Sequence, residues 1–145
     1  MFQSGLFARS GLGVFVAACG LTLALLGCAA VETAATVDPG SSFTLPVGKT
    51  AALRGTDTRL TFKEVSADSR CPTDVVCVWA GDATIAVVIS RNGAPDETQT
   101  MNINAPTNEI TSGNLRIKFV GLAPVPRQSD TSPRAYVAQF VVERL

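Results

Sequence analysis

Hydrophobic and polar residues alternate with a period of two along most of the chain after residue 42. In the stretch RLTFKE at 59–64, Leu60 and Phe62 fall on one face and Lys63 on the other. The same alternation recurs at 84–90 (TIAVVIS), 100–104 (TMNIN), 115–119 (LRIKF) and 135–143 (AYVAQFVVE), with weaker candidates at 43–47 and 50–53. Such alternation is typical of half-buried β-strands.

Turn-forming residues separate these stretches, and no segment of about ten residues carries a helical stripe. Examples are Gly-Thr-Asp at 55–57, Arg-Asn-Gly at 91–93 and Ser-Gly-Asn at 112–114. About seven short strands predict an all-β protein, an antiparallel β-sandwich of immunoglobulin-like size. A small barrel is the alternative, because the number of strands does not decide closure.

The inward-facing positions of the predicted strands define the expected core. They are Leu60, Phe62, Ile85, Val87, Ile117, Phe119, Tyr136 and Phe140.

The first 27 residues have a different pattern. Arg9 precedes a run at 11–27 that has no charged residue and is interrupted by glycines. Because a bilayer span needs roughly 20 apolar residues, an uncleaved membrane helix is the weaker interpretation. A basic residue, an apolar run and small residues at its end are typical of an export signal.

The end of this run, Leu-Leu-Gly-Cys at 25–28, resembles the lipobox of bacterial lipoproteins. The resemblance implies that residues 1–27 are cleaved and that Cys28 carries a diacylglyceryl group. A second partial match ends at Cys19. Two acyl chains suffice for stable membrane attachment, whereas one is marginal. In such signals, a residue other than Asp after the cysteine, here Ala29, implies the outer membrane facing the periplasm. In a bacterium without an outer membrane, the outer face of the cytoplasmic membrane is expected.

Residues 28–42 are rich in Ala, Thr and Ser and include Pro39-Gly40, which predicts a flexible, lipidated tether. Residues 43–145 then form a single domain.

The charge and composition of the chain exclude several classes of partner and of catalytic or metal site. The chain has 12 basic and 12 acidic residues, a formal net charge of zero and no histidine. Because charges of one sign are not grouped into a block along the chain, nucleic acid is not an expected partner. Without histidine, Ser-His-Asp and Cys-His sites are excluded, as are most zinc and copper sites. We expect no metal and no cofactor.

Cys71 and Cys77 are the cysteines left once Cys19 is removed and Cys28 is lipidated. Outside the cytoplasm such a pair normally oxidises, so a structural disulfide is the favoured interpretation. A redox pair is the first alternative, although the five-residue spacer differs from Cys-x-x-Cys. A metal site is weaker still, because two thiolates fill only half of a tetrahedral site.

Trp79 follows Cys77 by two residues, so on a strand both side chains would share a face. This spacing predicts a core tryptophan packed over the disulfide, as in immunoglobulin-like domains. The alternative is an exposed ring that contacts sugar or peptide.

The segment DSRCPTDVVCVWAGDA at 68–83 resembles a motif of a family of bacterial exported proteins and lipoproteins with no established activity. The similarity extends over roughly residues 43–144 and implies export and a β fold, but no reaction. Position 82 varies in the motif, so Asp82 is a weak candidate for a functional carboxylate.

These observations favour a membrane-anchored, non-catalytic module that binds, inhibits or supports a component of the cell envelope. Its partner, beyond the membrane, would be an envelope protein or glycan. Candidate binding residues are Trp79 and, in the loop at 123–134, Arg127 and Arg134.

The alternatives to a binding module are a hydrolase that uses carboxylates alone and a thiol-redox protein. Asp68, Asp74 and Asp82 also suggest a calcium loop, but they lack its regular spacing, so solvated turn aspartates are favoured.

Overall fold

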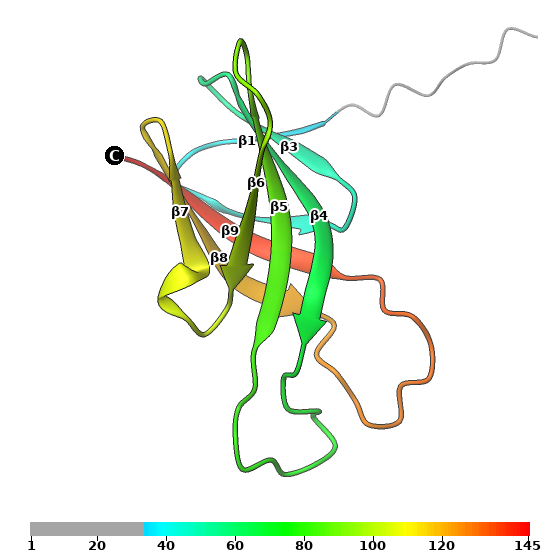
Figure 1. Ribbon diagram of the computed structural model, residues 1–145. Coiled ribbons are helices and arrows are strands. Elements are labelled where there is room, and N and C mark those ends of the chain that lie inside the picture. Colours follow the sequence, from blue (N-terminus) through cyan, green and yellow to red (C-terminus); the bar gives the residue numbers. More distant parts are fainter. Residues whose placement is uncertain (1–33) are drawn as a thin grey trace, which may run out of the picture. The chain divides into compact units, whose positions relative to one another are not determined.

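A computed structural model describes residues 34–145, in which strands dominate (Figure 1). Nine strands and one 3-10 turn lie within this range. The strands are β1 (Ala35–Val37), β2 (Ser42–Pro46), β3 (Thr50–Leu53), β4 (Thr58–Asp68), β5 (Ala83–Arg91), β6 (Glu97–Asn102), β7 (Glu109–Ser112), β8 (Leu115–Ala123) and β9 (Val137–Arg144). The 3-10 turn is η1 (Pro106–Asn108). No helix in this part of the chain is long and apolar enough to cross a membrane.

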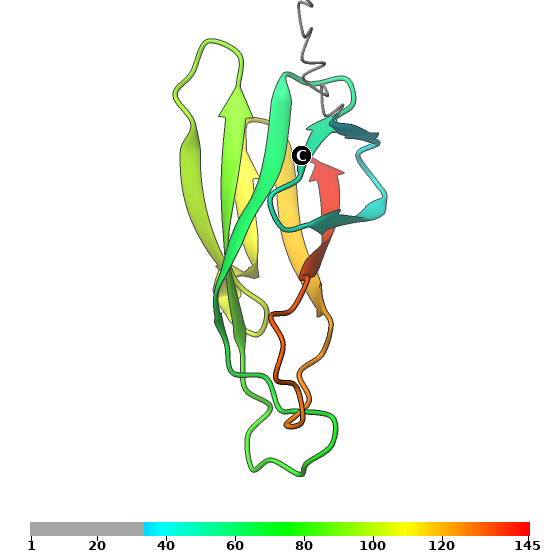
Figure 2. The same cartoon turned by 90° about the vertical axis from the view of Figure 1, so that its right-hand side faces the viewer.

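The strands form two separate sheets, which Figure 2 shows face to face. One sheet has the order β1-β3-β4-β5-β6, and the other has the order β2-β9-β8-β7. Every pairing is antiparallel except β1 with β3, which is parallel. The predicted β-sandwich is confirmed. Because the strands pair into two separate sheets, the alternative of a small closed barrel is wrong.

Alternating side chains from both sheets fill the space between them. Phe140 on β9 is the centre of this core, and its ring centroid lies 5.8 to 6.5 Å from those of Phe43, Phe62 and Phe119. Seven of the eight predicted core residues are fully buried, and Tyr136 is partly buried against them. A period of two therefore identified the inner face of the long strands correctly.

All seven predicted strands are present, and the two that the sequence did not predict are β1 and β7. β1 lies within the segment predicted to be a flexible tether, and Ala35–Val37 pair with Ala51–Leu53. Asp38 then forms a 2.9 Å ion pair with Arg54. The prediction of a tether up to residue 42 is thus wrong for β1 and its following turn, because sheet pairing here does not depend on large apolar residues.

Candidate functional site in two adjoining loops

Two loops meet at one end of the sandwich (Figures 1 and 2). The cysteine loop, residues 69–82, joins β4 to β5, and the proline loop, residues 124–136, joins β8 to β9. β1 lies toward the other end of the same sheet, because its partner strand β3 pairs with the first half of β4 whereas the cysteine loop leaves the last residue of β4.

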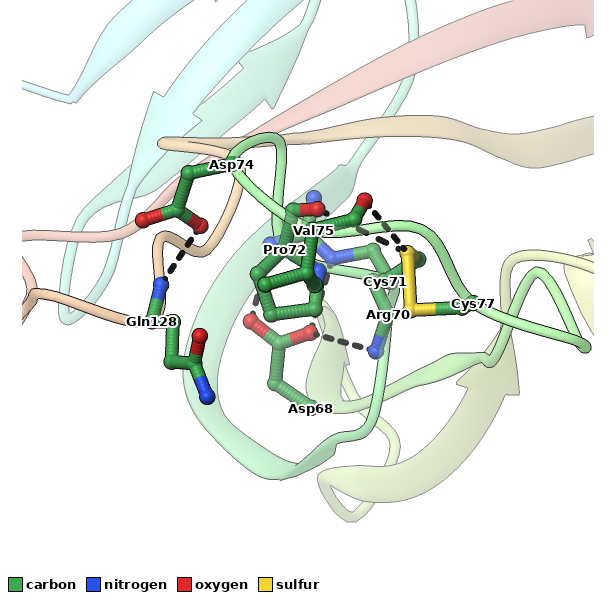
Figure 3. The surroundings of a disulfide bond; sticks show 8 residues. All are labelled: Asp68, Arg70, Cys71, Pro72, Asp74, Val75, Cys77 and Gln128. Atoms are coloured by element: carbon green, nitrogen blue, oxygen red, sulfur yellow. Dashed lines mark hydrogen bonds and ion pairs between the residues drawn. A yellow bond between two sulfur atoms is a disulfide. The ribbon is translucent and has the colours of Figure 1, made fainter.

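The cysteine loop is closed by covalent and backbone bonds. Cys71 and Cys77 form a disulfide with a Cα–Cα distance of 5.9 Å. Nearer the sheet, the amide of Ser69 donates to the carbonyl of Asp82 at 2.8 Å, and the amide of Cys71 donates to the carbonyl of Ala80 at 3.0 Å. The disulfide predicted from the two cysteines is confirmed, and it closes a loop within one hairpin connection (Figure 3).

Gly81 allows the two sides of the loop to approach each other this closely. Its φ of +70° lies in the left-handed region that favours glycine. A Cβ at this position would lie 1.9 Å from the carbonyl oxygen of Ser69. Any other residue would therefore force the base of the cysteine loop apart.

Asp68, at the end of β4, organises the base of both loops. Its two carboxylate oxygens accept hydrogen bonds from Nε and Nη2 of Arg70, each at 2.8 Å, and the hydroxyl of Tyr136 donates to Oδ2 at 3.0 Å. Arg134 lies 3.8 Å from the same oxygen. The Asp68 and Arg70 side chains are only 5% and 11% exposed, so this ion pair is largely shielded from water.

The surroundings of Asp68 favour its charged form. Burial raises the pKa of the carboxyl, but the hydrogen bonds from Arg70 and Tyr136 and the charge of Arg70 together lower it more. The net result is a pKa below the usual value for aspartate.

Arg70 also connects the cysteine loop to the other sheet. Its Nη1 donates to the carbonyl of Leu122 near the end of β8, and its Nη2 donates to the carbonyl of Pro124 at 2.9 Å. One guanidinium therefore binds the end of β4, the end of β8 and the start of the proline loop, a geometry that the planar fork of arginine suits.

A second set of bonds joins the loops farther from the sheets. The Thr73 amide donates to the Pro126 carbonyl at 2.9 Å. Asp74 accepts from the amides of Gln128 at 2.8 Å and Ser129 at 3.4 Å, as Figure 3 shows for Gln128. The backbone hydrogen bond from Gln128 is the main cause of a lowered pKa for Asp74. The two loops thus form one connected surface.

Beyond these bonds lies a group of exposed apolar side chains, here called the apolar tip: Val76, Val78 and Trp79. They are 101%, 88% and 82% exposed, respectively. The prediction that Trp79 packs in the core over the disulfide is wrong. Residues 77–79 do not belong to a strand, so the period-two rule does not apply to them. The disulfide also lies outside the space between the sheets, which Phe140 and its neighbours fill.

The two predicted arginines differ in their surroundings. Arg134 is 24% exposed and donates to Asp130 at 3.3 Å and to the Tyr136 hydroxyl at 3.1 Å, so it is part of the structural network. Arg127 is exposed, and its amide donates to Asp130 at 3.1 Å. Both arginines line an open pocket of about 460 Å³ formed by the proline loop.

The three loop aspartates do not gather into a metal site. Asp82 accepts from the amides of Ala83 and Asn104 and from the side chain of Asn102, at 2.8 to 3.2 Å. Within residues 34–145, no three metal-ligating side chains lie close enough to hold an ion. Asp74 is an exposed turn residue, as predicted, and its carboxylate also accepts hydrogen bonds from the proline loop. The prediction of a solvated turn aspartate is wrong for Asp68, which ends β4 with a side chain only 5% exposed, and for Asp82, which is half-buried.

Sequence reasoning did not identify Val76, Val78 or the partners of Asp68. The signal for Arg70 was present in the Asp-Ser-Arg-Cys-Pro segment, but nothing local connects it to Tyr136. Cys28 lies outside the described residues. Comparisons of this chain with protein-family models, with curated proteins and with solved structures return no match.

Proposed function

We propose that this protein is a bacterial lipoprotein, attached through Cys28, whose β-sandwich is a non-catalytic binding module of the cell envelope. The observation that carries the proposal is the apolar tip, three large apolar side chains held in water at the end of a cross-linked loop. Exposed apolar patches, in contrast to single scattered residues, mark interaction sites in soluble domains, and these three side chains lie within four consecutive residues.

The bonding of the loop carboxylates supports binding over catalysis. Asp68 and Asp74 have pKa values below the usual range for aspartate. A general acid needs the opposite, a raised pKa near the working pH. Both carboxylates also accept hydrogen bonds from groups that position the loops, a structural role that a proton-transfer role would disturb.

The placement of the tip supports a tethered module. β1 is the first strand of the described chain, and the apolar tip lies beyond the opposite end of its sheet. A lipid at Cys28 would precede β1 by only seven residues. An attached domain would then present the two loops away from its tethered side.

Attachment is tested by changing Cys28→Ser in the full-length chain. We expect an unprocessed precursor that incorporates no labelled fatty acid, whereas the matched variant Cys19→Ser is processed and lipidated normally. Lipidation of Cys28→Ser would show that the anchor is elsewhere, with Cys19 as the next site to test.

Binding is tested in living cells with a photo-crosslinking amino acid placed at single positions of the full-length chain. Val78 samples the apolar tip, Gln128 samples the proline loop, and Asn92, exposed in the β5–β6 turn, is the control. We expect discrete crosslinked products from one or both loop positions and none from Asn92. Products from neither loop would refute the binding function.

A further inference from the structure

We infer that the apolar tip inserts into an apolar pocket of a protein partner, with Trp79 as the anchoring side chain. This inference rests on the proposed function and specifies the class of partner. Its first support is the chemistry of the tip, since residues 75–81 (VVCVWAG) contain no charged side chain and no polar one apart from the indole N–H of Trp79. A surface that complements them must itself be mainly apolar.

The shape of the loop favours insertion over flat contact. Val76, Val78 and Trp79 project from a short segment whose base is fixed by a disulfide and by backbone bonds between its two sides. A preformed convex loop loses little conformational entropy on binding. Tryptophan is enriched among the residues that dominate binding energy, and such residues lie in desolvated pockets of the partner.

A glycan is a poorer occupant of this surface. Sugar recognition uses an aromatic face together with polar side chains that bind hydroxyl groups. The neighbours of the Trp79 ring in the chain are Val78 and Ala80, which offer only carbon atoms and backbone groups.

The anchoring membrane is a poorer occupant for geometric and electrostatic reasons. β4 has 11 residues and so spans about 35 Å, with β1 near its beginning and the tip beyond its end. The seven residues from Cys28 to β1 extend at most about 25 Å, at about 3.6 Å per residue, so the tip would touch that membrane only if the whole domain tilted over toward it. The chain also has no net positive charge with which to attract anionic lipids.

The nature of the product crosslinked through position 78 tests this inference. We expect a discrete band that is heavier than the chain by the mass of a second polypeptide and that muramidase leaves intact. We also expect this band to disappear when Trp79→Ala is added and to persist when Val120→Ala, an exposed apolar residue of β8, is added instead. A product that sediments with the cell wall until muramidase is added would assign the tip to a glycan. A crosslink to lipid would assign it to the membrane. Either result overturns the inference while leaving the binding function intact.

The crosslinked protein is then identified by mass spectrometry, purified, and titrated with the full-length chain in detergent. Replacement of a dominant anchor weakens binding by about 30-fold or more, so we expect at least this change in Kd for Trp79→Ala. Trp79→Phe should restore most of the affinity, and Val120→Ala should leave it unchanged. An unchanged Kd for Trp79→Ala would overturn the inference. Products from position 128 alone would keep the binding function and place its site in the proline loop.

Discussion

The ion pair between Asp68 and Arg70 provides the sharpest test of how the loops are held. We consider the substitution Asp68→Ala, which removes the acceptor for both guanidinium bonds and for the hydroxyl of Tyr136. Arg70, only 11% exposed, would keep its bonds to the carbonyls of Leu122 and Pro124 but lose its counter-charge.

The magnitude follows from this geometry. Removing one partner of a buried ion pair destabilises a protein by about 3–5 kcal/mol. The two remaining carbonyl acceptors of Arg70 place the expected loss at the lower end, about 3 kcal/mol. For a domain of this size, 1 kcal/mol corresponds to about 4 °C, so Tm should fall by about 12 °C.

The stabilisation should also depend on pH, because the pKa of Asp68 is lower in the folded protein than its usual value. A group with a depressed folded pKa stabilises fully above its unfolded pKa, about 3.9 for aspartate. That contribution disappears as the pH falls through the folded pKa. The difference in stability between the native chain and Asp68→Ala should therefore be constant near neutrality and shrink below about pH 4.

Chemical denaturation at several pH values measures the difference in free energy of unfolding between the two chains. Hydrogen exchange measures how often the loops open. We expect the amides of Cys71 and Thr73 to exchange faster in Asp68→Ala, because both close the loops that the pair supports. Asp96→Ala, at an exposed position of the connection between β5 and β6, is the matched control and should change stability by no more than about 0.5 kcal/mol. Equal effects of the two substitutions would refute a stabilising role for the Asp68–Arg70 pair.

Three further predictions concern the same loops. Reduction of the Cys71–Cys77 disulfide should add two hydrogens to the intact mass and lower stability by about 2 kcal/mol without unfolding the domain, because the ring is small. Free thiols in protein purified without a reductant would contradict this. Gly81→Ala should destabilise by more than about 2 kcal/mol, since its Cβ would clash with backbone, whereas Gly93→Ala, which also has a positive φ but open space, should cost about 1 kcal/mol; equal losses in thermal unfolding would remove the steric argument. Trypsin should cleave after Arg127 before Arg134, whose side chain is held by Asp130 and Tyr136; the reverse order in the N-terminal sequences of the fragments would count against a fixed Arg134.

Much of the sandwich could be predicted because its long strands alternate in a way that only a half-buried sheet explains. The strands around Phe62, Ile85, Phe119 and Phe140 each place successive side chains on opposite faces, and the structure buries the expected face. β1 and β7 escaped prediction because segments of three and four residues barely show a period, and for the same reason 50–53, which became β3, was only a weaker candidate. Their pairing depends on a neighbouring strand that is already in place.

The loops could not be predicted in the same way, because their order comes from contacts distant in sequence. Tyr136 donates to Asp68 across 68 residues, and Gln128 donates to Asp74 across 54. The sequence showed the cysteines and the turn residues but not these partners. The prediction for Trp79 was wrong because a rule for strands was applied to a segment that leaves the sheet.

At this end of the molecule, charged side chains are buried and apolar side chains are exposed, which is the reverse of an ordinary protein surface. Charged groups such as Asp68 and Arg70 are turned inward, where they join the two loops, while Trp79 and its valines face water. Burying the tip against the core would stabilise the isolated domain, because apolar area removed from water contributes about 25 cal/mol per Å². The chain instead fixes the loop with a disulfide and with Gly81, both of which keep the tip extended. Since none of these fixing bonds uses the side chains of the tip, loop geometry and tip chemistry can be altered separately. If Trp79→Ala weakens binding and leaves the free energy of unfolding unchanged, the loss therefore comes from recognition of the partner and not from folding.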